Sequence, residues 1–388
     1  MKLKMPVADF TAVVGNAHLF AAYDATHPAF SQTMLEITEK KSLRLTVVNS
    51  IAGCRFSVGG IEGEPGSLCV PTKIFDKLLQ GLPTSGEIKL GYNGKQLKIG
   101  VGKVGAKLVA TGTEDFVSIP KPPRDGWFEV KAVDIAHVSD AVAWSASSDY
   151  DNRPVLTGIH LNHKFSEAGD GHCHSRVVPG VIPEGHPPMV IPSAMVQKLR
   201  QILSAGRDGV VHVCVGDKFF WFRGKGWALY TLPVAESYYD VEEMVYAPDE
   251  NGVTRLTGGR TGNVFGIVVA RRQLHQAAQR VVRVAANQIM RFTVKDNTLT
   301  VATVNDGEKV DNSLRIAERL DWSADAELPA DFDRLSAVGF RPRYLASALA
   351  PFSSEVVRML WSDQDNSFQF HDDKGMKMVV MPRTLPGE

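Results

Sequence analysis

A pattern of apolar and polar positions occurs three times along the chain. Three segments open with a proline, continue with apolar residues at helical spacing, and then pass into strand-like runs separated by polar turns. A proline suits the first turn of a helix, where its missing N–H would have no partner. Each segment ends at a glycine and a further strand, and the spacing from proline to glycine agrees within one residue: Pro71 to Gly105, Pro192 to Gly226 and Pro342 to Gly375.

A second helical pattern precedes each of these segments. It starts at Pro6, Lys131 and Ala270, and strand pairs with a polar turn follow the first and third copies. The sequence therefore predicts an α+β fold of three repeated domains, each with two helices and antiparallel sheet. Turn-rich breaks at Ser118–Gly126 and around Tyr246–Gly252 divide the chain into domains 1–122, 123–248 and 249–388.

Composition favours a globular protein of the cytoplasm. The chain has 388 residues, of which 44% are hydrophobic, enough for more than one core. No stretch approaches the roughly 20 apolar residues that span a bilayer, and the amino terminus lacks the apolar core of a signal peptide. Four scattered cysteines (Cys54, Cys69, Cys173 and Cys214) fit a reducing compartment better than a disulfide framework.

The charges balance but are unevenly distributed. The chain has 43 basic and 43 acidic residues, yet no acid occurs between Glu250 and Asp296, where arginines gather. On the helix predicted from Ala270, polar and basic residues share one face: Arg272, Gln276, Gln279, Arg280 and Arg283. The opposite side is apolar: Leu274, Ala277, Ala278, Val281 and Val282. Such a face is either an ordinary solvated surface or a contact for phosphates.

Five motifs, in order along the chain, match segments of one known family. EDFVSIP from Glu114 is similar to x-D-F-P-x-L-P, and SSDYDNRPVLTGIHL from Ser147 is similar to R-P-x-L-x-G. IPSAMVQKL from Ile191 resembles I-P-x-K-x-L. The segment from Gly339 resembles F-N-P-x-Y-L-x-x-A-L, and MVVMPRTLP from Met378 resembles V-M-P-M-R-L. With these five motifs the chain resembles the bacterial DNA polymerase III β subunit family, the DNA sliding clamps.

The resemblance implies a ring rather than an enzyme. Two chains of the family join head to tail into six domains around duplex DNA, with helices lining the hole and no cofactor or metal. The homodimer would touch DNA without reading its sequence, as expected for contacts to phosphates. The positions expected to face DNA are Lys73, Lys77, Lys198, Arg200, Arg272, Arg280, Arg283, Arg341 and Arg343.

The resemblance also implies a pocket for short peptides of the DNA polymerase and of the clamp loader. Carried over by position, its lining is Leu156, Gly171, His172, Tyr344, Ser367, Val379, Val380, Met381 and Pro382. The sequence departs from the family pattern at places that help line this pocket, notably Cys173, His174 and Arg383. Val379 and Val380 read equally well as core strand residues.

The resemblance places the dimer interface at an edge strand of the first domain. Ala106 and Leu108 would lie against Val284 and Ala285 of the other chain, and these small side chains predict a weak contact. We expect Leu108→Asp to yield monomers.

The rival interpretation is a metal-dependent hydrolase built on the His- and Asp-rich loop 160–174. Its candidate ligands are His160, His163, Asp170, His172 and His174. No second ligand cluster supports a tetrahedral zinc site, and Cys173 has no identifiable group to orient a base beside it. A monomeric or trimeric clamp-like protein is a third alternative.

Overall fold

The computed structural model describes most of the chain. The described residues are 1–22, 27–117, 119–178, 180–204, 209–234, 237–239, 241, 246–248, 254–256, 264–285, 289–295, 298–304, 317–324, 338–361 and 367–383. They form two compact units. Unit 1 comprises Met1–Ala136 and Gln197–Pro233, and unit 2 comprises His137–Val196 and Val234–Glu388.

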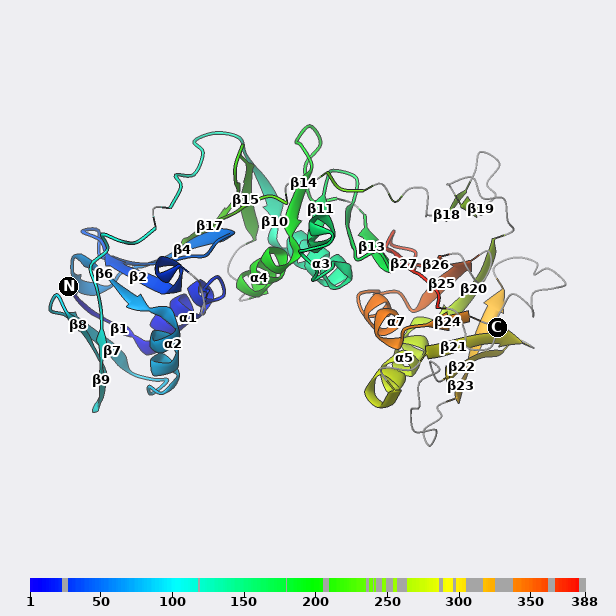
Figure 1. The fold of residues 1–388 in the computed structure, drawn as a ribbon, viewed down its shortest axis with the longest axis horizontal. Coiled ribbons are helices and arrows are strands. Elements are labelled where there is room, and N and C mark those ends of the chain that lie inside the picture. Colours follow the sequence, from blue (N-terminus) through cyan, green and yellow to red (C-terminus); the bar gives the residue numbers. More distant parts are fainter. Residues whose placement is uncertain are drawn as a thin grey trace. The chain divides into compact units, whose positions relative to one another are not determined.

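One topological motif, a strand, a helix and three further strands, recurs six times among the described residues (Figure 1). The first two copies give β1 (Lys2–Pro6), α1 (Val7–His18), β2 (Gln32–Ile37), β3 (Ser42–Val48), β4 (Ala52–Gly59), and then β6 (Gly66–Pro71), α2 (Thr72–Gln80), β7 (Glu87–Tyr92), β8 (Gln96–Val101), β9 (Val104–Val109). The short strand β5 (Glu62–Glu64) lies between them, and η1 (Pro28–Ser31) precedes β2.

The middle of the chain contains the next two copies. They are β10 (Trp127–Lys131), α3 (Ala132–Val142), β11 (Gly158–Leu161), β12 (Ser166–Gly169), β13 (Cys173–Val177), and then β14 (Met189–Pro192), α4 (Ser193–Ser204), β15 (Val210–Val215), β16 (Phe220–Gly224), β17 (Trp227–Thr231). Two 3₁₀ turns, η2 (Ala143–Ser145) and η3 (Pro154–Thr157), stand between α3 and β11. The boundary between the two compact units falls inside α3 and α4.

The last two copies complete the pattern. They are β20 (Phe265–Ala270), α5 (Arg271–Ala285), β21 (Ile289–Lys295), β22 (Thr298–Val304), β23 (Ala317–Ala324), and then β24 (Val338–Phe340), α7 (Pro342–Leu349), β25 (Val356–Trp361), β26 (Phe368–His371), β27 (Lys377–Val380). Before them, β18 (Tyr246–Pro248) pairs with β19 (Thr254–Leu256), so a short strand occupies part of the second predicted break. Described residues 119–126, in the first predicted break, form neither helix nor strand.

Neighbouring copies exchange their first strands. β1 pairs with β7, and β6 pairs with β2; β10 pairs with β15, and β14 with β11. β20 pairs with β25, and β24 with β21. All these pairings are antiparallel, so the α+β class with antiparallel sheet is confirmed. The exchange joins the copies in pairs; the division into three domains remains a prediction.

Longer sheets arise because β17 pairs with β4 and β13 pairs with β27. Unit 1 therefore has a sheet β5-β1-β7-β8-β9 and a second sheet β10-β15-β16-β17-β4-β3-β2-β6. Unit 2 has one continuous sheet, β14-β11-β12-β13-β27-β26-β25-β20-β23-β22-β21-β24.

The repeated prolines begin helices as expected. Pro71 and Pro192 end the strands before α2 and α4, and Pro342 is the first residue of α7. The repeated glycines are less uniform. Gly226 and Gly375 have φ of 80° and 85°, but Gly105 lies within β9, and Gly102 supplies the positive φ for that hairpin. Among the described residues no helix is both long and apolar enough to cross a membrane.

Candidate functional site

Helix α5 separates an apolar face from a basic face. Leu274, Ala277, Ala278 and Val281 are at most 1% exposed, and Val282 is half-buried. Burying a side chain such as Leu274 contributes roughly 1.5–3 kcal/mol, so this face fixes how the helix lies on its sheet. Arg272, Arg280 and Arg283 are exposed on the other side.

Helix α7 packs against α5 and adds to the basic face. Arg341 precedes its first turn in extended conformation and Arg343 is its second residue; both are exposed. Neither helix contains an acidic residue. We call Arg272, Arg280, Arg283, Arg341 and Arg343 the arginine surface, a set of cations with the charge and spread to contact a phosphate backbone.

The basic residues expected to face DNA in unit 1 are less uniform. Lys73 and Lys77 are exposed on α2, whereas Lys198 and Arg200 on α4 are half-buried. The Lys198 ammonium lies 5.5 Å from the centroid of the Phe20 ring, and its burial lowers the pKa of Lys198. The nine predicted positions therefore fall into two groups, four residues in unit 1 and the arginine surface in unit 2.

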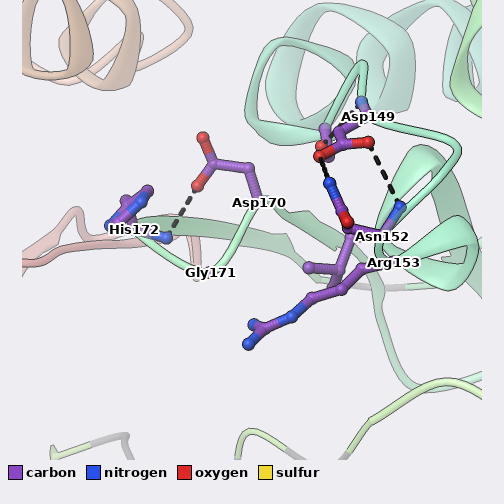
Figure 2. Close-up of a pocket in the computed structure, with 8 residues that line it drawn as sticks. Asp149, Asn152, Arg153, Asp170, Gly171 and His172 are labelled. Atoms are coloured by element: carbon purple, nitrogen blue, oxygen red, sulfur yellow. Dashed lines mark hydrogen bonds between the residues drawn. The ribbon is translucent and has the colours of Figure 1, made fainter.

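A pocket of ≈ 360 Å³ lies in unit 2, where the segment before η3 meets the turn between β12 and β13 (Figure 2). It is lined by Ser147, Asp149, Asn152, Arg153, Leu156, Asp170, Gly171 and His172. Its lining is mixed: Leu156 is buried and apolar, while two carboxylates, a guanidinium and an imidazole supply polar groups.

Asp170 organises one wall of the pocket. Its carboxylate accepts a hydrogen bond from the backbone N–H of His172 at 2.8 Å (Figure 2). It also accepts one from the backbone N–H of Cys173 at 2.9 Å. The Tyr344 hydroxyl on α7 donates to the same carboxylate at 2.8 Å. Burial and this carboxylate raise the pKa of Tyr344 to about 12, so the phenol stays protonated and remains a donor. Gly171, with φ of 90°, allows the tight turn.

The opposite wall is a turn before η3. Asp149 accepts the backbone N–H of Asp151 at 3.1 Å and the side-chain amide of Asn152 at 2.6 Å. Asp149 and Asp151 therefore belong to one hydrogen-bonded turn. The Arg153 guanidinium reaches across to Gly171, where an added Cβ would lie 3.3 Å from Nη1 (Figure 2).

The structure brings together some of the predicted pocket residues. Leu156, Gly171 and His172 line the pocket; Tyr344 bonds to its wall, and the Met381 N–H donates to the His172 carbonyl at 2.8 Å. Pro382 follows Met381 and is half-buried. Ser367, Val379 and Val380 are 6%, 3% and 0% exposed, and Val380 pairs with Cys173 and Phe368 inside the sheet. None of these three residues is among those that line the pocket.

Sequence reasoning missed five lining residues: Ser147, Asp149, Asn152, Arg153 and Asp170. All five lie in segments already singled out, the SSDYDNRPVLTGIHL motif and loop 160–174. Turns with Asp and Asn carry polar groups that face solvent, which was the available signal.

The histidines of loop 160–174 do not converge on a metal site. His160 Nδ1 and His174 Nε2 lie 2.8 and 3.2 Å from the carboxylate of Glu167, and Arg176 Nη2 donates to it at 2.7 Å. Glu167 is 2% exposed. Burial opposes its ionisation, but the bonds from His160 and His174 and the charge of Arg176 prevail and lower its pKa to about 2. The carboxylate is thus already engaged by the Arg176 guanidinium and by two imidazoles.

The other candidate ligands of the hydrolase interpretation do not form a metal site either. His163 is exposed, and Asp170 is engaged by Tyr344 and the loop backbone. Burial raises the pKa of the Cys173 thiol, which disfavours the thiolate that a nucleophile requires. No group of three or more potential metal ligands occurs in the described part of the chain.

The strand predicted to form the dimer interface is an edge of its sheet. β9 pairs only with β8 among the named strands, so its other side carries unpaired backbone groups. Ala106 is half-buried and Leu108 is 7% exposed, whereas Val104 and Val109 are 46% and 68% exposed. Val284 and Ala285 belong to the last turn of α5, but their side chains lie outside the described part of the structure.

Comparisons with known proteins agree on one fold. No family model matches the chain. It is 20% identical to the beta sliding clamp of Lactococcus lactis over 376 residues, 92% of each chain. It is 22% identical to the beta sliding clamp of Pseudomonas aeruginosa over 333 residues, 83% of each chain.

Solved structures extend the likeness to nearly every residue. A sliding clamp (DNA polymerase III subunit beta) from Bartonella birtlesii, bound to griselimycin, is 20% identical with a TM-score of 0.83 over 99% of this chain and 100% of that one. A putative DNA polymerase III beta subunit from Eubacterium rectale is 16% identical with a TM-score of 0.82 over the same shares. The chain therefore has the fold of the DNA polymerase III β subunits and resembles them as a divergent relative.

Proposed function

We propose that this chain is a DNA sliding clamp, a non-catalytic protein that encircles duplex DNA and tethers a polymerase to it. The observation that carries the proposal is the likeness of fold to DNA polymerase III β subunits over 99% of the chain, at TM-scores from 0.80 to 0.83. A topological role requires a closed shape and no reacting groups. A fold of repeated units is suited to such a shape.

The arginine surface supports contact with DNA. Four exposed arginines on two packed helices, and Arg341 just before α7, produce a local positive potential although the whole chain is neutral. Contacts of this kind act on phosphates and are independent of base sequence, which a sliding protein requires. Lys73, Lys77, Lys198 and Arg200 would add weaker contacts from unit 1.

The active form in this proposal is a head-to-tail homodimer of three-domain chains, with domains 1–122, 123–248 and 249–388. Head-to-tail pairing forms a closed ring only if the rotations that relate successive subunits add up to a full turn. In this proposal two copies complete the turn. The exposed edge of β9, with Val104 and Val109 beside Ala106 and Leu108, offers backbone hydrogen bonds and apolar area for that contact.

The pocket in unit 2 would hold short peptides of the DNA polymerase and clamp loader. It combines an apolar side chain, Leu156, with polar groups at its rim, as suits an extended peptide. Two of the similar solved structures are sliding clamps bound to griselimycin. Such a protein would work beside the chromosome in the bacterial cytoplasm or in a phage-infected cell.

The hydrolase alternative has no support in the structure, because His160 and His174 are engaged by Glu167 and the described residues hold no ligand cluster. Elemental analysis of the purified protein tests it directly. A stoichiometric metal that disappears when His172 or His174 is substituted would revive that alternative.

The decisive experiment compares retention on circular and linearised plasmid after loading. A ring stays on circular DNA at high salt and slides off the ends of the linear form. Equal, salt-sensitive dissociation from both, with loading verified independently, would contradict the proposal and indicate ordinary electrostatic binding.

A second experiment tests the dimer contact by sedimentation. The dimer has about twice the 42.4 kDa mass of the chain. Leu108→Asp is a poor probe, since Leu108 is buried within its own sheet and the change would damage folding. Val109→Asp places the charge on an exposed position of the same strand, and we expect it to yield folded monomers. An unchanged dimer would exclude this edge.

A further inference from the structure

The outer face of the sheet β1-β7-β8-β9 in unit 1 carries uncompensated lysines. Alternate residues of these strands are buried: Ile88, Leu90, Leu97, Ile99 and Leu108 are at most 7% exposed. The residues between them point to the opposite face, where Lys89, Lys98 and Lys107 are exposed. Lys95 and Lys103 are exposed in the two adjoining turns. We call these five residues the lysine face (β7–β9 in Figure 1).

The register places these charges close together. Lys98 and Lys107 are direct cross-strand partners, and Lys89 is diagonal to Lys98 because it pairs with Gly100 while Lys98 pairs with Gly91. Direct partners have Cβ atoms about 5 Å apart and diagonal ones about 7–8 Å apart, so the like charges repel. The two lysines of β1 are neutralised: Lys2 by Glu64 at 2.8 Å and Lys4 by Glu87 at 3.0 Å.

No such compensation exists for the lysine face. None of its five ammonium groups has an ion-pair partner among the described residues, and no acidic residue occurs in the sequence between Glu87 and Glu114. One explanation for lysines on an edge strand is that they prevent unwanted strand pairing and bind nothing. That explanation accounts for Lys107 on β9 but not for Lys89 and Lys98, which lie on the interior strands β7 and β8.

The surroundings favour a phosphate backbone as the partner. Outward positions next to the lysines are glycines: Gly91, Gly100 and Gly105. A Cβ at Gly91 would meet nothing within 4 Å, so the face is low and open there. The outward positions of β7, β8 and β9 include no aromatic side chain, which removes the stacking platform that single strands need. Lysine ammonium groups act as point charges on phosphates.

We infer that the lysine face binds the phosphate backbone of duplex DNA, as a contact in unit 1 that does not depend on the arginine surface of unit 2. It would engage duplex without regard to sequence. It does not require ring closure, so it can hold or fail separately from the proposed clamp function.

The test measures affinity for a short, blunt, linear duplex by fluorescence anisotropy across a salt series. Lys89→Glu/Lys98→Glu/Lys107→Glu is compared with a control of equal charge change at other exposed lysines, Lys121→Glu/Lys164→Glu/Lys218→Glu. Both are made in the intact chain and in an Arg272→Glu/Arg280→Glu/Arg283→Glu background. In that background we expect the lysine-face variant to weaken binding by a further factor of about ten or more. The salt slope should fall by about 0.9 for each phosphate that the variant no longer neutralises.

An equal decrease in duplex affinity for the two lysine variants would overturn the inference, because only the net charge of the protein would then matter. Unchanged duplex affinity in both variants would also overturn it. A poly-glutamate peptide is tested in the same assay. If the peptide binds through the lysine face while the lysine-face substitutions leave the affinity for duplex DNA unchanged, the partner is an acidic protein, and the inference is overturned.

Photo-crosslinking tests the inference without altering the lysines. The four native cysteines are buried, so a cysteine introduced at Gly91 can be labelled selectively with a photoreactive group. Gly91→Cys should crosslink to duplex DNA and Lys218→Cys should not. Absence of crosslinks from position 91 in protein that binds the duplex would contradict the inference.

Discussion

The helix pair α1–α2 of unit 1 and the helix pair α5–α7 of unit 2 have the same place in the repeated motif, but the first pair is mixed in charge and the second is basic. α1 has no lysine or arginine and exposes Asp9, and α2 offers Lys73 and Lys77 beside Asp76. α5 and α7 expose arginines and contain no acid. The comparison teaches that the packed face is set by the fold, while the solvent face is free to acquire a charge that serves function.

The buried polar centres of the two units also differ in charge: the centre in unit 1 is built on a neutral histidine, and the centre in unit 2 on an ionised carboxylate. In unit 1, His18 lies 3.1 Å from both Asp76 and Thr33, and Thr33 bonds to Thr72 at 2.9 Å. Burial lowers the pKa of His18, which keeps the imidazole neutral. In unit 2, Glu167 is ionised among His160, His174 and Arg176. In unit 1 a neutral histidine thus links α1 to α2, whereas unit 2 contains a buried charged carboxylate.

The largest expected effect comes from removing that charge. Glu167→Gln removes the negative charge that pairs with the buried Arg176 guanidinium, and we expect a decrease of about 3–5 kcal/mol in the free energy of unfolding. Hydrogen exchange read by mass spectrometry should locate the decrease in unit 2. The double variant with Arg176→Gln should cost less than the sum of the single variants. Strict additivity would show that the pair is not coupled.

The surface comparison is tested next by reversing charges on matched helices. Arg272→Glu/Arg280→Glu/Arg283→Glu should weaken duplex binding about a hundredfold, roughly 2.7 kcal/mol, and reduce the salt slope by about 3. Lys73→Glu/Lys77→Glu on α2 should have the smaller effect, below about tenfold. Fluorescence anisotropy over a salt series measures both. A larger decrease in affinity from the α2 variant would reverse the assignment of the main DNA contact.

The neutral centre of unit 1 predicts a smaller change of stability. His18→Ala removes the contacts to Asp76 and Thr33 and leaves Thr33 less well bonded in the core, at an expected cost of about 1–3 kcal/mol. Hydrogen exchange should show faster opening of α1 and α2 with unit 2 unchanged. Asp76→Asn, which keeps the size and one acceptor, is the matched control and should cost less.

The smallest effect is the pH dependence of that centre. Burial lowers the pKa of His18 in the folded chain, so the unfolded chain binds the proton more readily. The contribution of His18 to stability is therefore complete only at a pH above its ordinary pKa of about 6.5. Its contribution is lost as pH falls below that value, by at most about 1.4 kcal/mol per pH unit. Glu167 loses its contribution only from about pH 4.5 down to about 2. Denaturant titrations of wild type and His18→Gln between pH 7 and 5 should therefore converge at low pH; parallel curves would contradict this account.

Much of the fold was predictable because it rests on local pattern. The prolines Pro71, Pro192 and Pro342 marked helix starts, and the apolar stripe of α5 from Leu274 to Val281 is buried as its spacing required. The site was harder, because position in a motif does not give exposure. Val379 and Val380 match the family's pocket by sequence, yet their pairing with β13 and β26 buries them, whereas Arg153, which lines the pocket, went unnoticed.

By itself, the sequence determined the repeated motif, the α+β class and the charged face of α5, since periodicity and helix-start chemistry act over a few residues. Only the tertiary structure decided which strands exchange between copies, because that pairing joins residues far apart in the chain. It also decided that Tyr344 reaches Asp170, that Glu167 collects two histidines and an arginine, and that Lys89, Lys98 and Lys107 share one face. The strand pairings among these depend on register, and a shift of one residue would turn the side chains to the other side of the sheet.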